Sequence, residues 1–269
     1  MGVINVTPDS FSDGGQFLDA DSALRRAEEM IAEGADIIDV GGESTRPGGG
    51  VITADEEMRR VVSIVERLAK TATIPISVDT TKAVVARAAL DAGAEIINDI
   101  SALRFDYTIA DEVARAHAGL VLMHSRGTPA TLHRMPPSPD IFEEVQSSLR
   151  RSINMAVRCG VSRDSIALDP GIGFGKTFEQ NIELIARLDQ FAAEFSDYPI
   201  LIGTSRKSFI GRLLDDAPPD ERIHGTMATV VAAVLRGADI VRVHDVRAAV
   251  DTVRVADAIK CTMNNSDGS

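Results

Sequence analysis

The sequence predicts an α/β protein with one domain, folded as a (β/α)8 barrel, also called a TIM barrel. Three segments carry nearly the same pattern: 34-GADIIDVGG-42, 93-GAEIINDIS-101 and 237-GADIVRVHD-245. Each follows an alanine-rich amphipathic stretch, starts with a glycine that would end a helix, and continues through a short β-branched run into polar residues. The length of 269 residues is usual for one such barrel. A doubly wound open sheet is the alternative for this repeated unit.

Short apolar runs supply the expected strands in chain order. The three repeated segments contribute the second, fourth and eighth strands, and the others are expected at about Val3–Val6, Ile74–Val78, Leu120–Met123, Ile166–Leu168 and Ile200–Gly203. Helical periodicity fills the intervals, at about 21–33, 55–71, 81–92, 109–118, 141–159, 178–193, 220–236 and 246–262. Eight strands and eight helices in strict alternation favour the barrel, since no linker interrupts them. We therefore expect one domain over 1–269, with a long Pro-rich loop at 127–140 and a frayed tail at 264–269.

The composition limits the partners of the protein. Its formal charge of −12 argues against a nucleic acid or an anionic membrane surface, so any anionic ligand must be held by a local group of cations. The two cysteines, Cys159 and Cys261, lack the spacing of metal ligands or of a disulfide framework. Without a signal peptide or a long apolar run in the sequence, we expect a cytoplasmic protein.

The segment 166-IALDPGIGFGKT-177 combines a buried-type strand with an acid, Asp169, at its end and a glycine-rich continuation. Its glycines permit tight turns and a close approach of the backbone to a ligand. The spacing is neither that of the dinucleotide fingerprint nor that of the P-loop. By itself the segment is compatible both with a binding loop and with an ordinary turn in which the acid caps the next helix.

Polar residues also follow the other strands, which makes the binding-loop interpretation the stronger one. In a parallel barrel the carboxyl ends of all strands share one face, where active sites lie. A single residue such as Asp79 or Asn98 could instead cap a helix. Polar groups after all eight strands favour an active site: Asn5, Asp9, Asp13, Thr45, Arg46, Asp79, Asn98, Asp99, His124, Asp169, Arg242, His244 and the segment 203-GTSRKS-208.

The chemistry of these residues falls into two groups. Asp79, Asn98, Asp169 and Lys207 offer donors and acceptors that suit a flat heterocycle with an amino-amide edge, because a carboxylate can accept two parallel N–H bonds from such an edge. Met123 is placed to pack on the ring face.

The second group is typical of an anion site. Arg46, Arg242 and His244, together with the helix start after Ser205, suit a phosphate or a diphosphate. The amide oxygen of Asn5 is a suitable ligand for a Mg²⁺ ion shared with the phosphates. From its residues, the chain is thus expected to be a barrel enzyme that binds a heterocycle and a phosphorylated leaving group.

Eight motifs in this order resemble the dihydropteroate synthase family of pterin-binding barrels. They cover nearly the whole chain: NVTPDSFSDGG (5–15), GGESTRPG (41–48), SVDTTK (77–82), NDIS (98–101), MH (123–124), LDPGIGFGKT (168–177), GTSRKSFIG (203–211) and RVHDV (242–246). The resemblance implies the barrel fold and an enzyme of folate synthesis. Such an enzyme condenses 6-hydroxymethyl-7,8-dihydropterin diphosphate with 4-aminobenzoate, giving 7,8-dihydropteroate and diphosphate. It also implies a sulfonamide target.

The resemblance implies a role for each matching residue. The pterin would be held by Asp79, Asn98, Met123, Asp169, Gly203 and Lys207, and the diphosphate by Asn5, Arg46, Arg242 and His244, with Asn5 also on Mg²⁺. The 4-aminobenzoate would lie against Thr45, Pro47, Phe174 and Ser208. Catalysis is assigned to Asp13, Lys207 and Arg46, on the expectation that diphosphate departs before the amine attacks and that the loops carrying Asp13 and Arg46 close over the site.

Two other functions remain possible from the sequence. A barrel that binds a complete folate, as in corrinoid-dependent methyltransferases, would share the pterin acids but would not need the anion site. A non-catalytic pterin-binding paralogue would be expected to lose Asp13, Arg46 or Lys207, all of which are present. Members of the family resemble homodimers, and the apolar segments 229–235 and 248–259 could supply either a dimer face or ordinary barrel packing.

Overall fold

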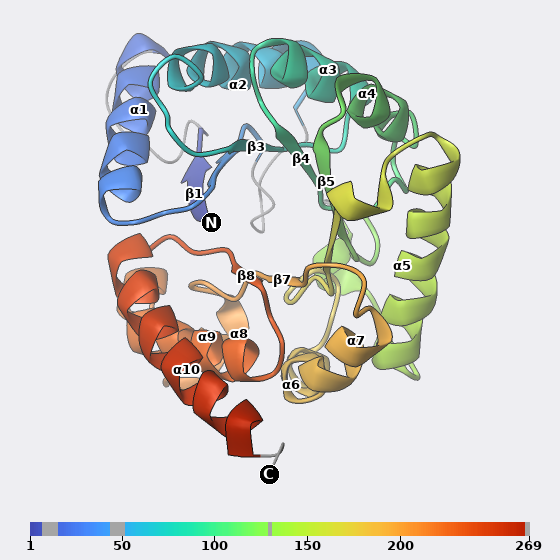
Figure 1. The fold of residues 1–269 in the computed structure, drawn as a ribbon, viewed down its shortest axis with the longest axis vertical. Helices are drawn as coiled ribbons and strands as arrows, with labels where there is room; N and C mark the ends of the chain where they lie inside the picture. Colours follow the sequence, from blue (N-terminus) through green and yellow to red (C-terminus); the bar gives the residue numbers. More distant parts are fainter. Residues whose placement is uncertain (7–15, 44–51, 129–130, 267–269) are drawn as a thin grey trace.

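The structure, a computed structural model, describes residues 1–6, 16–43, 52–128 and 131–266. Within these residues it has eight strands, as expected: β1 (Gly2–Asn5), β2 (Ile38–Gly41), β3 (Ile76–Asp79), β4 (Ile96–Asp99), β5 (Gly119–Met123), β6 (Ile166–Asp169), β7 (Leu201–Ile202) and β8 (Ile240–Val241). The strands lie inside a ring of helices (Figure 1).

The helices of the ring are α1 (Gln16–Ala32), α2 (Ala54–Leu68), α3 (Ala83–Asp91), α4 (Ile109–Ala116), α5 (Ile141–Arg158), α6 (Phe178–Ala186), α7 (Leu188–Glu194), α8 (Ser208–Leu213), α9 (Ile223–Leu235) and α10 (Val246–Ser266). Short 3-10 turns, η2 (Leu132–Arg134), η3 (Arg163–Ser165) and η4 (Pro219–Glu221), occur between them.

The eight strands close into a barrel. The first six pair in parallel in the order β1-β2-β3-β4-β5-β6, and β7 pairs in parallel with β8. Two parallel bridges join these sheets, Leu168 with Ile200 and Gly2 with Val243. At the second junction the amide of Val3 donates to the carbonyl of Val243 at 3.0 Å. The barrel prediction is therefore confirmed, and the open-sheet alternative is excluded because β1 has a neighbour on both sides.

Three details of the helices differ from the expectation. The region 178–193 contains two helices, α6 and α7, which change direction at Arg187, a residue whose backbone (φ −107°, ψ 19°) lies outside the helical region. The segment after β7 forms the short helix α8 before α9 begins. Helix α10 extends to Ser266, so residues 264–266 are helical rather than part of a frayed tail, and 267–269 lie outside the described residues.

Glycines end the helices where the repeated pattern predicted. Gly34, Gly93 and Gly237 have φ values of +100°, +109° and +100°. Only glycine adopts these values without steric cost, and each one turns the chain from the end of a helix into the next strand. The same turn repeated around the ring sets the alternation of helix and strand.

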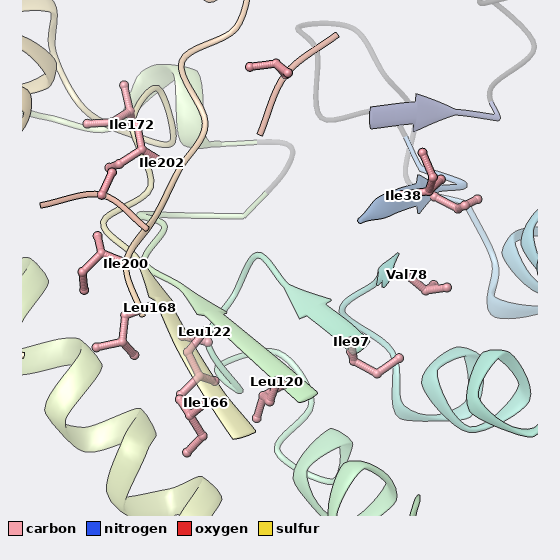
Figure 2. Packing of buried hydrophobic residues seen from close by; sticks show 14 of the residues in the cluster. Ile38, Val78, Ile97, Leu120, Leu122, Ile166, Leu168, Ile172, Ile200 and Ile202 are labelled. Atoms are coloured by element: carbon pink, nitrogen blue, oxygen red, sulfur yellow. The ribbon is translucent and has the colours of Figure 1, made fainter. Parts of the chain in front are cut away.

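Strand residues alternate between two apolar clusters. Side chains that point outward belong to the large core between strands and helices; in Figure 2, Leu120 and Leu122 of β5 lie beside Ile166 of the adjacent strand β6. Side chains of the opposite parity form a separate small cluster of Met1, Val121 and Leu201, with Ile37, Ile96, Ala167 and Ile240 packed against it. This cluster fills the amino end of the barrel interior, and the residues two positions further along each strand point to its carboxyl end.

We expect Gly237→Ala to destabilise the fold more than Gly34→Ala. Both substitutions force alanine into a left-handed backbone, a cost of about 1–2 kcal/mol. At Gly237 the added Cβ would also lie 2.8 Å from Cβ of Ala192, whereas at Gly34 its nearest contact is Val250 at 3.4 Å. Urea denaturation of the two variants measures the difference, and equal losses would contradict the packing contribution at Gly237.

Candidate active site

The strand register brings the expected site residues together at the carboxyl end of the barrel. Asn5 is level with Gly41, Gly41 with Asp79, and Asp79 with Asn98 across the neighbouring strands β1 to β4. On the far side, Met123 of β5 is level with Asp169 of β6. Because all of these share the inward parity, their side chains converge on one mouth.

Neighbouring residues of a strand point to opposite faces. Two of the polar residues expected in the mouth, Asp99 and His124, therefore point away from it. Asp99 follows Asn98 and is fully buried behind the strand, where its carboxylate accepts from the hydroxyl and the amide of Ser101 and from the amide of Leu103. Burial raises the pKa of Asp99 to about 6, and these hydrogen bonds act against the rise. Asp99 holds the turn after β4.

His124 likewise follows Met123 and is buried with 3% of its surface exposed. Burial lowers the pKa of its imidazole well below the usual value, and the nearby cations Lys176, Arg104 and Arg126 act in the same direction. The imidazole faces away from the mouth, and among the described residues its buried Nδ1 has no hydrogen-bond partner.

An ion-pair network that the sequence analysis missed occupies the centre of the mouth. Nε of Arg242 donates to Oδ2 of Asp39 at 2.6 Å, and its Nη2 donates to Oδ2 of Asp79 at 3.1 Å. Asp39 lies in the middle of β2 and has no exposed surface. The one available signal was an acid inside the apolar run ADIIDVGG, at the inward parity.

Asp39 also organises its neighbours in the barrel. Its Oδ1 accepts from the hydroxyl of Ser77 at 2.6 Å, and its Oδ2 accepts from the side-chain amide of Asn98 at 3.3 Å. A buried carboxylate needs this many donors to offset the loss of its hydration. Asp39 thus positions Asn98, one of the expected heterocycle contacts, as well as Arg242.

The pKa of the Asp79 carboxyl group is strongly raised by its surroundings. Burial raises its pKa to about 8; Arg242 acts in the opposite direction, and the acids Asp39, Glu57 and Asp99 add to the rise. A carboxyl group that titrates near neutral pH inside a pocket is a common property of functional sites.

Asp169 and Lys207 face each other from β6 and from the start of α8. Burial raises the pKa of Asp169 and lowers that of Lys207 to about 8, while the attraction between the two opposes both shifts. The Lys207 ammonium lies 4.6 Å from the centre of the Phe174 ring and donates to the carbonyl of Ile172. The cation–π contact and the hydrogen bond fix the lysine beside the acid.

The remaining described site residues lie around this centre. A Cβ added at Gly203 would be 3.8 Å from Cβ of Arg242 and 4.0 Å from Nζ of Lys207, so this glycine borders both cations. Nδ1 of His244 is 2.9 Å from the hydroxyl of Ser205, and Ser208 is exposed as the first residue of α8. The expected anion group is therefore only partly assembled, because Arg242 is paired with two acids. Asp13, Thr45, Arg46 and Pro47 lie outside the described residues.

A second lysine joins the loops after β5 and β6. Nζ of Lys176 donates to the carbonyls of Gly171 at 2.7 Å, Phe174 at 3.2 Å and His124 at 3.3 Å. Burial lowers its pKa to about 7, against the attraction of Asp169. From the sequence this lysine was only a side chain that projects from a glycine-rich loop.

Among the described residues there is no group of three or more His, Cys, Asp or Glu side chains that could hold a metal ion by themselves. In that same part of the chain, no helix combines the length and the apolar character needed to cross a membrane.

The chain matches the model of a family described as pterin binding enzyme over residues 1–244. It is 48% identical to the dihydropteroate synthase of Bacillus subtilis over 96% of this chain and 87% of the relative. A crystal structure of dihydropteroate synthase from Clostridium difficile in the presence of pteroic acid superposes with a TM-score of 0.90 at 47% identity, covering 96% of this chain and 95% of the other. The dihydropteroate synthase of Yersinia pestis in a sulfonamide drug complex also superposes with a TM-score of 0.90, at 40% identity over 97% and 94% of the two chains.

The raised pKa of Asp79 leads to a pH-dependent stability. Because the folded protein keeps a proton on this carboxyl up to about pH 8, while the unfolded chain releases it near its ordinary pKa of 3.8, this contribution to the free energy of unfolding falls as the pH rises between these values. Asp79→Asn does not titrate, so we expect its free energy of unfolding relative to the wild type to increase from pH 5 to pH 8.

Urea denaturation at several pH values measures this difference. Asp106→Asn is the matched control, because the pKa of Asp106 is lowered and its contribution is complete above pH 5. A difference for Asp79→Asn that stays as constant as that of Asp106→Asn would contradict the raised pKa.

Proposed function

The chain belongs to the pterin-binding enzyme family and has the dihydropteroate synthase activity of its relatives, and we propose how the mouth of its barrel carries out that reaction. The enzyme condenses 6-hydroxymethyl-7,8-dihydropterin diphosphate with 4-aminobenzoate, giving 7,8-dihydropteroate and diphosphate. The observation that carries the proposal is the strand register, which aligns Asp79 with Asn98 and Met123 with Asp169 on the inward face.

The pterin is held by the acids of the mouth. The carboxylate of Asp169 accepts two parallel N–H bonds from the amino-amide edge of the ring, and Asp79 and Asn98 contact the opposite edge. Lys207 donates to the ring from the side of Asp169, and Met123 packs on its face. Gly203 leaves space beside Lys207 and Arg242 for the flat heterocycle.

The diphosphate is bound by Asn5, Arg46, Arg242 and His244. Arg242 is already fixed on Asp39, so its guanidinium needs little ordering when the anion arrives. Its bond to Asp79 is the one that binding can replace, because at 3.1 Å it is the longer of the two contacts with acids. Asp79 then becomes available to the pterin as phosphate oxygens approach Arg242.

The residues beside Asn5 fit a Mg²⁺ ion. Gly41 leaves a gap between two oxygen donors, since a Cβ added there would lie 3.8 Å from Oδ1 of Asn5 and 4.0 Å from Oδ2 of Asp79. Magnesium prefers oxygen ligands and is often held by one or two protein oxygens together with substrate phosphates. Asn5 would hold the ion there, and its chemistry would be to offset the negative charge that develops on the leaving diphosphate.

The 4-aminobenzoate lies against Phe174, with Thr45 and Pro47 beside it and its carboxylate at Ser208. Phe174 offers an aromatic face next to Lys207, so the amine of the second substrate comes near the methylene carbon of the pterin. Sulfonamides occupy this same position.

Catalysis requires stabilisation of two charges, the negative charge on the leaving diphosphate and the positive charge on the pterin methylene. When the C–O bond breaks, diphosphate leaves with the bonding electrons, and the negative charge is stabilised by Arg46 and Arg242. Asp13 stabilises the positive charge that remains on the pterin methylene. The amine nitrogen then forms the C–N bond and loses a proton, while Lys207 holds the ring in place.

We further propose that the enzyme acts as one domain, works as a homodimer and is cytoplasmic. Val255, Ile259 and Met263 lie four residues apart on α10 and are 62%, 46% and 53% exposed, an apolar stripe that a second copy would cover. Two free cysteines agree with a reducing compartment.

The decisive experiment is a diphosphate-release assay with the dihydropterin diphosphate ester. We expect release that depends on 4-aminobenzoate, yields dihydropteroate, and is lost when EDTA removes Mg²⁺ and restored when Mg²⁺ is added back. Binding of the ester without turnover would contradict the proposed function and favour a non-catalytic pterin-binding protein.

Replacing Asp13 tests its assignment to catalysis. We expect Asp13→Ala to lower kcat about a hundredfold, since charge stabilisation at the developing cation is lost, with pterin affinity changed less than threefold. Steady-state kinetics and calorimetry measure the two effects. Asp21→Ala, which removes a half-exposed acid paired with Arg67 on the surface, is the control; equal losses of turnover and pterin affinity in Asp13→Ala would overturn the assignment.

A further inference from the structure

The loop from Gly171 to Lys176 is held by cations along most of its length. The carbonyls of Gly171 and Phe174 accept from Lys176, that of Ile172 accepts from Lys207, and that of Gly175 accepts from Arg126 at 3.1 Å. Hydrogen bonds to charged donors contribute more than neutral ones, about 1.5–3 kcal/mol each. A loop of three glycines is thereby fixed in one conformation.

The conformation of this loop requires its three glycines. Gly171, Gly173 and Gly175 have φ values of +72°, +86° and +73°. A Cβ added at Gly171 would lie 1.7 Å from the carbonyl oxygen of His124, so the loops after β5 and β6 touch backbone to backbone at this point. The amide of Gly173 donates to Oδ1 of Asn181 at 2.6 Å and fixes the middle of the loop from α6.

Lys176 is the side chain that spans the contact between the two loops. Its ammonium bonds the carbonyl of His124, the residue after Met123, and also the carbonyl of Phe174. Met123 belongs to the proposed pterin pocket and Phe174 to the proposed 4-aminobenzoate site. One ammonium group therefore links the backbone of one substrate site to the backbone of the other.

The Lys176 ammonium is engaged by the protein backbone. Its three hydrogen bonds go to backbone carbonyls, which the long side chain reaches from the end of the loop. The neighbouring Lys207 approaches the same loop from α8 and bonds the intervening carbonyl of Ile172. The two lysines hold successive parts of the loop that presents the Phe174 ring.

We propose that Lys176 is a positioning residue for the second substrate: by joining the carbonyl of His124 to those of Gly171 and Phe174, it sets the distance between the pterin wall and the aromatic face on which 4-aminobenzoate lies. The inference rests on the proposed function for the identity of the two substrates. Displacement of a bound ring by about 1 Å is enough to lower a reaction rate strongly.

The test is Lys176→Met, which keeps an unbranched side chain one atom shorter and removes its hydrogen bonds. We expect the KM for 4-aminobenzoate to rise about tenfold or more, while the dissociation constant of the dihydropterin diphosphate ester, measured by calorimetry, stays within twofold of the wild type. Gln180→Ala, four residues after Lys176, is the matched control. It removes the capping box of α6 and a hydrogen bond to the carbonyl of Ser138. The hydrogen bonds to the loop carbonyls remain. The control is expected to lower the unfolding midpoint and to leave both constants unchanged.

Two results would overturn the proposal. The first is an unchanged KM for 4-aminobenzoate in Lys176→Met. The second is an equal weakening of both substrates, which would indicate general support of the mouth. If Lys176→Met does not fold, Lys176→Gln, whose amide retains two N–H donors, is measured in the same way, and an increase confined to 4-aminobenzoate is again expected.

Failure of the proposed function gives a different pattern. In that case the wild type itself releases no diphosphate, and KM values do not exist. Binding of 4-aminobenzoate to the protein saturated with pterin and diphosphate is then measured by calorimetry in the wild type and in Lys176→Met. If Lys176→Met binds 4-aminobenzoate more weakly than the wild type, the positioning role is supported even though no reaction occurs. Equal binding by the two proteins overturns it.

Discussion

The buried ion pair between Arg242 and Asp39 is the interaction on which the rest of the mouth depends. It joins the end of β8 to the middle of β2, and the same carboxylate accepts from Ser77 on β3 and Asn98 on β4. Removing one partner of such a pair leaves an uncompensated charge in the interior, which costs about 3–5 kcal/mol. Replacing both partners by apolar residues of similar volume often preserves a fold, but here Asn98 would lose a bond that holds its side chain, and the mouth would lose the guanidinium. We therefore interpret Asp39 as a residue kept for the geometry of the site.

This arrangement explains how an acidic protein can bind an anion. The chain carries a formal charge of −12, yet the mouth brings together Lys207 and Arg242, with Lys176 behind them. Arg242 is paired with Asp39 and Asp79, the charge of Asp169 acts on both lysines, and burial lowers the pKa of both lysines. In the proposed function, phosphate oxygens replace Asp79 at Arg242.

Strand parity divides the polar strand ends into two kinds. Asn98 and Met123 point into the mouth, while Asp99 and His124, one residue later, are buried behind the strands. The outward residues support the turns from which the loops leave the barrel: Asp99 holds the amides of Ser101 and Leu103. In the proposed function Asn98 contacts the ligand, and Asp99, on the other side of the same strand, fixes the backbone next to it.

The sequence by itself determined the order of helices and strands, the glycines that end the helices, and most of the residues in the mouth. These features depend on periodicity and on backbone conformations set within a few residues, so they can be recognised without the fold. It placed Asp99 at the mouth beside Asn98, because one residue of register decides which side chain faces inward. It did not reveal the pairing of Asp39 with Arg242 or the three carbonyls bound by Lys176. Those contacts join residues as far as 203 positions apart, and only closure of the barrel brings such residues within hydrogen-bonding distance.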